Sequence, residues 1–82
     1  MTKKEMKEIF IFKLEREREA LNRCREKRNN ATTDKERKNW TECIYDYRKT
    51  MTDIICMMHV DFKIVKLDES MQLYNKYIFG LE

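Results

Sequence analysis

A thiol and an imidazole stand one helical turn apart in the sequence Cys56-Met57-Met58-His59, which contains the single histidine of the chain. A cysteine thiolate with a histidine base is a common nucleophilic pair, and residues three apart on a helix can be neighbours. Catalysis also needs a group that orients the base, donors for an oxyanion and a loop that admits substrate, and the sequence offers no obvious candidate for them. We therefore expect a surface cysteine and a surface histidine, and no catalytic residues.

Three cysteines and one histidine match the ligand count of a structural zinc centre. Cys43 and Cys56, however, are thirteen residues apart in a helical pattern, which separates them by about 20 Å along a continuous helix. Zinc ligands must converge to about 2.3 Å from the ion, so we expect no metal site. Cys24 and Cys43 suit a core, and Cys56 an exposed position. Because glycine-rich phosphate motifs are also missing from the sequence, we expect neither a cofactor nor an enzyme.

Basic residues are concentrated in residues 16–38, which carry nine Lys and Arg against five Asp and Glu. Such a stretch can contact the phosphates of nucleic acid or of a nucleotide. The alternative is a solvated surface that neutralises itself, since Glu19–Arg23 and Asp34–Lys38 have the spacing of intrahelical ion pairs. We favour the self-neutralised surface. The candidate contacts for nucleic acid or another anion are Arg23, Arg25, Arg28, Arg37 and Lys38.

Four consecutive large apolar residues, Ile9-Phe10-Ile11-Phe12, stand near the N-terminus. One stripe of a helix cannot bury all four. We expect Ile9 and Phe10 in the protein interior, with the other two either beneath the C-terminal segment or in a subunit interface. The candidate interface residues are these two and two aromatic residues that we expect to be exposed, namely Ile11, Phe12, Tyr45 and Tyr77.

The positions of these residues depend on two long helices. Thr2-Lys3-Lys4-Glu5 and Thr33-Asp34-Lys35-Glu36 both fit the capping box, which predicts helices over about residues 2–29 and 33–59. The intervening cluster Asn29-Asn30-Ala31-Thr32 favours a turn, so the helices should fold back on each other as an antiparallel hairpin.

Apolar residues recur at spacings of three and four in both helices. In the second helix the predicted stripe is Trp40, Ile44, Tyr47, Met51, Ile54 or Ile55, and Met58. In the first helix, Lys13 and Glu17 interrupt a stripe of Met6, Ile9, Phe10, Leu14, Leu21 and Cys24.

The path of residues 59–67 is ambiguous, because its apolar residues could continue the helix, form an irregular corner or form a short strand. Asp68 can cap a final helix over about residues 68–80, and Gly80 is placed to end it. Its apolar face is predicted to contain Met71, Tyr74, Ile78 and Leu81.

The chain of 82 residues has no proline, one glycine and 40% charged residues, a composition typical of long helices. We predict a single all-α domain over residues 1–82, built as a long antiparallel hairpin plus a short C-terminal helix. A domain this small buries little apolar surface, so we expect homodimerisation to complete a helical bundle.

An odd number of cysteines and the lack of a long apolar run predict a cytoplasmic protein without a membrane segment. The function that fits best is a non-catalytic interaction protein, a regulator or inhibitor of the phage or mobile-element type that binds a partner protein. The alternative is a helical oligomer that binds nucleic acid or a nucleotide through residues 16–38.

Overall fold

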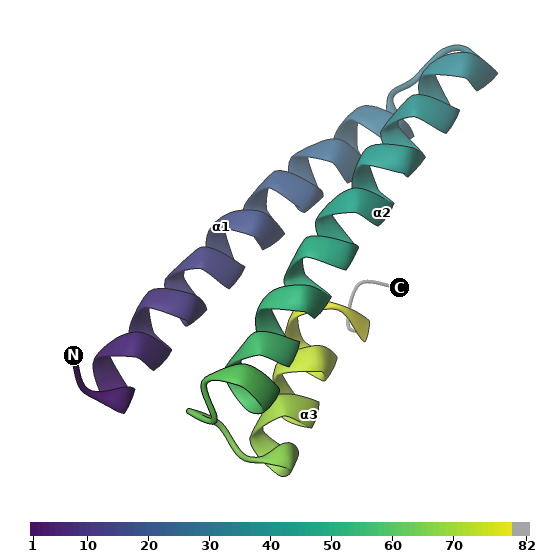
Figure 1. Ribbon diagram of the computed structural model, residues 1–82. Coiled ribbons are helices and arrows are strands. Elements are labelled where there is room, and N and C mark those ends of the chain that lie inside the picture. The colour runs from purple at the N-terminus through teal and green to yellow at the C-terminus, as the bar shows by residue number, and fades with distance from the viewer. Residues whose placement is uncertain (80–82) are drawn as a thin grey trace.

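The computed structural model describes residues 1–79 and folds them into three α-helices and one π-helical turn (Figure 1). Helix α1 spans Lys3–Asn29, α2 spans Asp34–Cys56, the π-helical turn η1 spans Met57–Asp61, and α3 spans Leu67–Tyr77. Helices α1 and α2 lie antiparallel along each other, and α3 packs beside the half of this hairpin that is far from the bend. The all-α hairpin with a short C-terminal helix is therefore confirmed.

Both helices start where the sequence predicts them, but only the threonine half of each capping box forms. The carboxylate of Glu5 accepts from the Thr2 hydroxyl, and that of Glu36 accepts from the N–H of Thr32 rather than of Thr33. The hydroxyl oxygen of Thr2 accepts a hydrogen bond from the backbone N–H of Glu5 at 3.1 Å, and that of Thr33 accepts one from Glu36 at 3.2 Å. Each satisfies an N–H group that has no partner within its own first helical turn. At the bend, the N–H of Asn30 donates to the carbonyl of Glu26 at 3.0 Å, and this bond closes the last turn of α1.

The hydrophobic core lies between α1 and α2 and is closed by the C-terminal segment. The stripe predicted on α2 is confirmed, although Trp40 and Tyr47 at its tip end are only partly buried. On α1 the charged pair Lys13 and Glu17 interrupts the apolar stripe, so this helix contributes fewer core residues. The buried apolar residues are Leu14, Leu21, Cys24, Ile44, Met51, Ile54, Ile55, Met58, Val65, Tyr77 and Ile78.

The placement of Ile9 in the interior is wrong, because its side chain is 54% exposed. Phe10 is partly buried, as expected, and its ring centroid lies 5.4 Å from that of Phe62. Ile11 also packs against the core. The buried face of α1 therefore lies closer to α3 than the sequence predicts, and Ile9 lies on the exposed side of the helix.

The segment after α2 is an irregular corner rather than a strand, among the residues that the structure describes. The α-helix ends at Cys56, and helical geometry then widens into η1, where the N–H of Phe62 donates to the carbonyl of Met57 at 2.9 Å. Lys63 adopts a left-handed conformation with φ of 52° and reverses the chain. The N–H of Ile64 then bonds to the carbonyl of Met58 at 2.9 Å, which fixes the corner against the end of α2.

Helix α3 begins one residue earlier than expected and is not capped by Asp68. Its N-cap is Lys66, which makes no side-chain capping bond, and Asp68 lies inside the first turn. The α-helix ends at Tyr77, and the expected stop at Gly80 lies outside the described residues.

The buried face of α3 also differs from the predicted one. Ile78 is buried and Tyr74 half-buried as expected, but Met71 is 50% exposed. The face is instead formed by Ser70, Tyr77 and the half-buried Leu73. Leu81, which we assigned to the same face, lies beyond residue 79, where the description ends.

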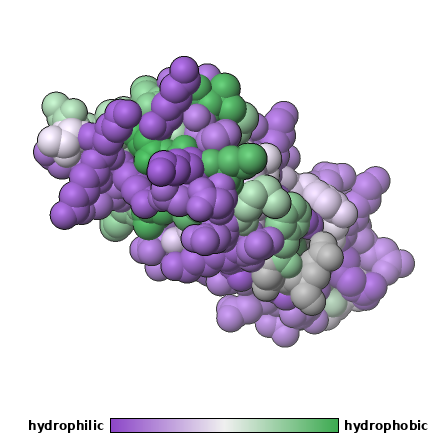
Figure 2. All heavy atoms as spheres, turned by 90° about the horizontal axis from the view of Figure 1, so that it is seen from below, coloured by the Kyte–Doolittle hydropathy of each residue, from purple (hydrophilic) through white to green (hydrophobic). Residues whose placement is uncertain are grey.

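Polar contacts attach α3 to α1. The ammonium of Lys7 lies 2.8 Å from the carboxylate of Glu69, and its hydrogen bond is the main cause that lowers the pKa of Glu69. At the other end of α3 the hydroxyl of Tyr77 donates to Glu15 at 3.3 Å. Seen from below in Figure 2, hydrophobic side chains gather mainly on the half of the molecule far from the bend.

Candidate functional site

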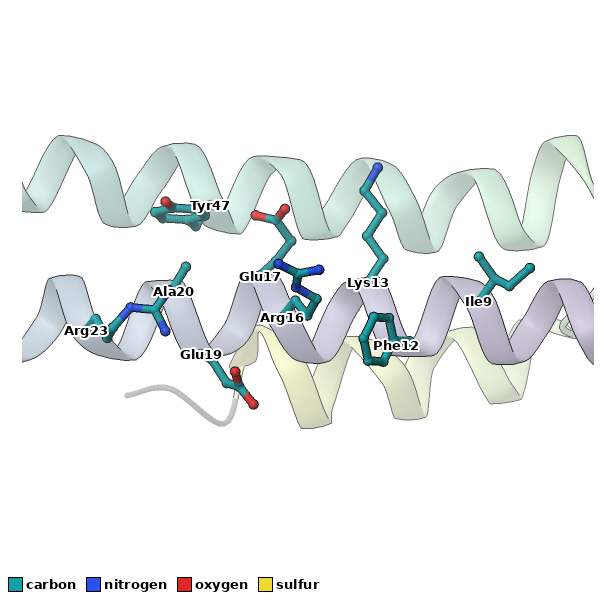
Figure 3. A pocket seen from close by; sticks show the side chains of 9 residues that line it. All are labelled: Ile9, Phe12, Lys13, Arg16, Glu17, Glu19, Ala20, Arg23 and Tyr47. Carbon is teal, nitrogen blue, oxygen red and sulfur yellow. The ribbon is translucent and has the colours of Figure 1, made fainter.

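A groove runs along the outer side of α1, beside α2 and away from the core. It has a volume of about 590 Å³ and is open along its length (Figure 3). We call it the α1 groove, and it is lined by Ile9, Phe12, Lys13, Arg16, Glu17, Glu19, Ala20, Arg23 and Tyr47. Only Tyr47 comes from α2, so the surface is essentially one face of α1 with an aromatic wall.

The residue types in the α1 groove alternate between apolar and charged. Ile9 and Phe12 expose more than half of their side chains, and the guanidinium carbon of Arg16 lies 5.8 Å from the centroid of the Phe12 ring. Lys13 and Glu17 extend from α1 toward α2 (Figure 3). Both charge signs are therefore present along the α1 groove, which is not a uniformly basic surface.

Toward the bend, the α1 groove continues into a smaller hollow of about 220 Å³ between α1 and α2. Here the ammonium of Lys27 lies 4.8 Å from the centroid of the Trp40 ring, a cation–π contact. Arg23 and Tyr47 line both hollows and join them.

A second, separate pocket of about 120 Å³ also lies between α1 and α2. Its floor is formed by Leu21 and Ile44, both buried. We call it the arginine pocket, and its lining consists of Leu21, Arg25, Arg28, Thr41, Ile44, Tyr45 and Arg48. None of these side chains is acidic, which distinguishes the arginine pocket from the α1 groove.

The structure does not bring the four candidate interface residues together. It does bring two of them together, because Ile11 and Phe12 both line a hollow of about 400 Å³ on α1. Phe12 is 62% exposed and also lines the α1 groove, whereas Ile11 is partly buried against the core. Tyr45 is exposed but belongs to the arginine pocket. The premise that Tyr77 is exposed is wrong, because its side chain is 3% exposed and packs in the core. Burial raises the pKa of its hydroxyl.

The candidate anion contacts are also divided. Arg25 and Arg28 line the arginine pocket, but Arg23 lines the α1 groove. In the described part of the chain, neither predicted ion pair, Glu19–Arg23 or Asp34–Lys38, is formed. Asp34 pairs instead with Arg37 at 2.8 Å. Residues 16–38 therefore do not form one continuous basic face.

Arg18 has a structural role that the sequence did not reveal. Its guanidinium donates to the backbone carbonyls of Lys76 at 3.1 Å and Tyr77 at 3.0 Å, at the C-terminal end of α3. These carbonyls carry the negative end of the helix dipole, so a cation is favourable there. The pKa of Arg18 is lowered, first by burial and then by the nearby charge of Arg25. Nothing in the spacing of α1 signals this role, because it depends on where α3 docks.

Among the described residues, no hydrogen bond joins the thiol of Cys56 to the imidazole of His59. Cys56 is exposed, and Nδ1 of His59 lies 3.1 Å from the carbonyl oxygen of Val65, to which it donates. His59 thereby holds the corner after η1. Cys24 is buried, as expected, and burial raises the pKa of its thiol. Within residues 1–79, no group of three His, Cys, Asp or Glu side chains is arranged to hold a metal ion.

Comparisons with protein-family models, with curated proteins and with solved structures find no match to this chain. In the part of the chain that the structure describes, every helix is too short or too polar to cross a membrane.

Proposed function

We propose that this chain is a non-catalytic helical interaction protein that works as a homodimer and regulates or inhibits a partner protein, as expected for the phage or mobile-element type. The observation that carries the proposal is the outer face of α1. Ile9 and Phe12 are largely exposed beside a groove of about 590 Å³ that α3 does not cover. Exposed apolar side chains next to a groove are typical of a protein interface.

The proposed occupant of the α1 groove is the same groove of a second copy. A two-fold axis near Leu14, perpendicular to α1, would set the two α1 helices antiparallel. Lys13 would then approach Glu17 of the second copy, and Phe12 would approach Arg16 of the second copy. Each contact occurs twice in a symmetric interface, which makes a self-complementary face effective.

Shape supports the same arrangement. Ile9 and Ala20 lie on opposite sides of Leu14, so the larger side chain of one copy would meet the smaller side chain of the other. Two hairpins joined in this way form a four-helix bundle, a common route to stability for helical proteins. A chain of 82 residues gains most from such an assembly, because its own core is small.

The first test is the molar mass in solution, measured by light scattering over a concentration series under reducing conditions. We expect a dimer for the natural chain and a monomer for Phe12→Lys, since its ammonium would face Arg16 of the second copy as well as Arg16 of its own chain. Leu67→Lys is the matched control, because Leu67 is 64% exposed at the start of α3, outside the α1 groove. A monomeric natural chain, or equal loss of mass in both variants, would reject this interface.

A charge exchange tests the arrangement itself. Lys13→Glu and Glu17→Lys each place like charges opposite each other in the proposed dimer, so each should weaken association. The double variant restores both pairs and should restore the dimer. Failure of the double variant to recover, with helicity unchanged, would reject the antiparallel arrangement.

The regulatory part of the proposal assigns the chain to the cytoplasm, and three free cysteines are consistent with a reducing compartment. The proposal also holds that the chain regulates its partner by binding to it and not by catalysis. What supports this is a pair of surface hollows formed by helix faces, with no histidine lining either of them.

The second candidate is nucleic-acid binding through residues 16–38, and the basic arginine pocket is the observation in its favour. Reversing Arg23, Arg25 and Arg28 should then weaken binding to a DNA or RNA duplex and flatten its dependence on salt. Binding that is undetectable at low salt would remove this candidate.

A further inference from the structure

We propose that the arginine pocket is a binding site for a single phosphate group, either free phosphate or the phosphate of a small phosphorylated molecule. The site is independent of the proposed dimer, because none of the residues of the arginine pocket lines the α1 groove. It differs from the alternative of nucleic-acid binding in using one pocket rather than the whole basic stretch.

The first support is charge without compensation. The uncompensated charges are those of Arg25 and Arg28, which enter the pocket from α1; Arg48 of α2 also lines it but already has an interaction of its own. In the described part of the chain, neither Arg25 nor Arg28 has an ion pair or a side-chain hydrogen bond. On a surface where glutamates alternate with arginines, two neighbouring guanidinium groups are left for an outside anion. Their planar forks match the oxygens of phosphate and can bind it through two parallel hydrogen bonds.

The floor of the pocket strengthens this attraction. Leu21 is fully buried and Ile44 nearly so, and they form an apolar base beneath the guanidinium groups. Charges above an apolar base are screened less than charges surrounded by water. Tyr45 adds a hydroxyl donor at the rim, while the hydroxyl of Thr41 already donates to the carbonyl of Arg37 at 2.8 Å and can only accept.

The size of the pocket selects the ligand. Sites for drug-sized molecules usually measure about 300–1,000 Å³, and the arginine pocket measures about 120 Å³. One phosphate group fits this volume, whereas a whole nucleotide would have to extend into solvent.

The test is a titration with inorganic phosphate at constant ionic strength, balanced with sodium chloride and followed by NMR of the arginine side chains and of Tyr45. We expect saturable shifts at Arg25, Arg28 and Tyr45, with Arg37 at the hairpin tip unaffected. Arg28→Gln should weaken phosphate binding about tenfold or more, the loss expected for one charge-assisted hydrogen bond. Arg28→Lys keeps the charge but loses the planar fork of the guanidinium, so its affinity for phosphate should lie between those of the natural chain and Arg28→Gln.

Arg37→Gln is the control, because it removes a basic residue of the same stretch that lies outside the pocket. Circular dichroism of each variant shows whether the fold is intact, and light scattering shows whether the dimer is. Phosphate shifts equal to those produced by chloride would overturn the proposal, as would equal losses in Arg28→Gln and Arg37→Gln. Binding of a nucleic-acid duplex through Arg28 without binding of inorganic phosphate would overturn it in favour of the second candidate function.

Discussion

The two halves of the hairpin differ in how their core is closed. In the open half, residues 3–17 of α1 pack with residues 48–79, and three helices enclose Leu14, Met51 and Ile55 completely. In the tip half, residues 18–47, the described core is formed by α1 and α2, and its buried apolar residues are Leu21, Cys24 and Ile44. Beyond them toward the bend, the described side chains are half-buried or exposed.

This difference separates stability from binding. A layer of two helices cannot exclude water from both of its sides, so the tip half is held by capping and by contacts such as Lys27 over Trp40. It also leaves its guanidinium groups accessible, which a phosphate site requires. The open half buries its apolar residues under α3 and should unfold last. The predictions below compare the two halves.

Leu14 and Leu21 are both 0% exposed, one in each half, so they form a matched pair. Leu14→Ala should lower the free energy of unfolding by about 3–5 kcal/mol, since a core enclosed by three helices relaxes little around the cavity. Leu21→Ala should cost about 2–3 kcal/mol, because neighbouring side chains can move into a two-helix layer. Urea unfolding followed by circular dichroism measures both. Equal costs would contradict the proposed difference in packing.

Arg18 joins the two halves, because it leaves α1 at the boundary and binds the last carbonyls of α3. Arg18→Gln should destabilise the docking of α3 by about 1.5–3 kcal/mol, the usual contribution of hydrogen bonds to a charged group. In Arg18→Gln, the backbone amides of α3 should lose protection from hydrogen exchange, while those of the tip half should keep their protection. Arg37→Gln, at the hairpin tip, should leave both unchanged. Uniform loss of protection in Arg18→Gln would show that α3 does not open separately.

The hairpin was predictable because its signals are local. Each capping box lies within four residues, and the bend is marked by adjacent asparagines, so neither requires knowledge of the rest of the fold. The stripe of α2 was predictable for the same reason, since one face of this helix is continuously apolar.

The orientation of α3 was not predictable in this way. Met71 and Leu73 lie on different sides of α3, and both choices give an apolar face. The choice is made by partners more than fifty residues away, in particular Lys7 with Glu69 and Arg18 with the end of α3. The same distant contacts bury Tyr77 and turn Ile9 outward, which explains both errors.

The candidate surfaces were predictable in part. The apolar run identified Phe12, because four large residues exceed what one stripe can bury. The basic stretch identified Arg25 and Arg28, but the composition did not separate them from Arg23. That separation needs the positions of side chains around α1, together with Tyr45 and Arg48 from α2.

Capping offers a third comparison between the halves. Thr33→Ala removes the acceptor for the N–H of Glu36 at the tip, and Thr2→Ala removes the equivalent acceptor for Glu5 at the open end. Each should cost about 1 kcal/mol of helix stability. For Thr33→Ala we expect local loss of hydrogen-exchange protection at residues 34–37, because few buried residues hold the tip. A larger global effect from Thr2→Ala would indicate that the start of α1 matters more than the bend.

A rise to alkaline pH should lower the free energy of unfolding less than the substitutions above, through one group in each half. Burial raises the pKa of Cys24 above its ordinary value of 9.0 and that of Tyr77 above 10.0, so the folded chain keeps protons that the unfolded chain releases. These two groups therefore contribute a constant stability below about pH 9, and this contribution falls as pH rises, first through the tip-half thiol and then through the open-half hydroxyl. Urea midpoints between pH 7 and 10.5 measure this decline. Cys24→Ala should remove the early part, and Tyr77→Phe should reduce the later part, which Tyr74 shares because burial also raises its pKa. Tyr45→Phe, at an exposed position, is the control. If the decline stays the same in all three variants, burial at these two positions does not govern the response to pH.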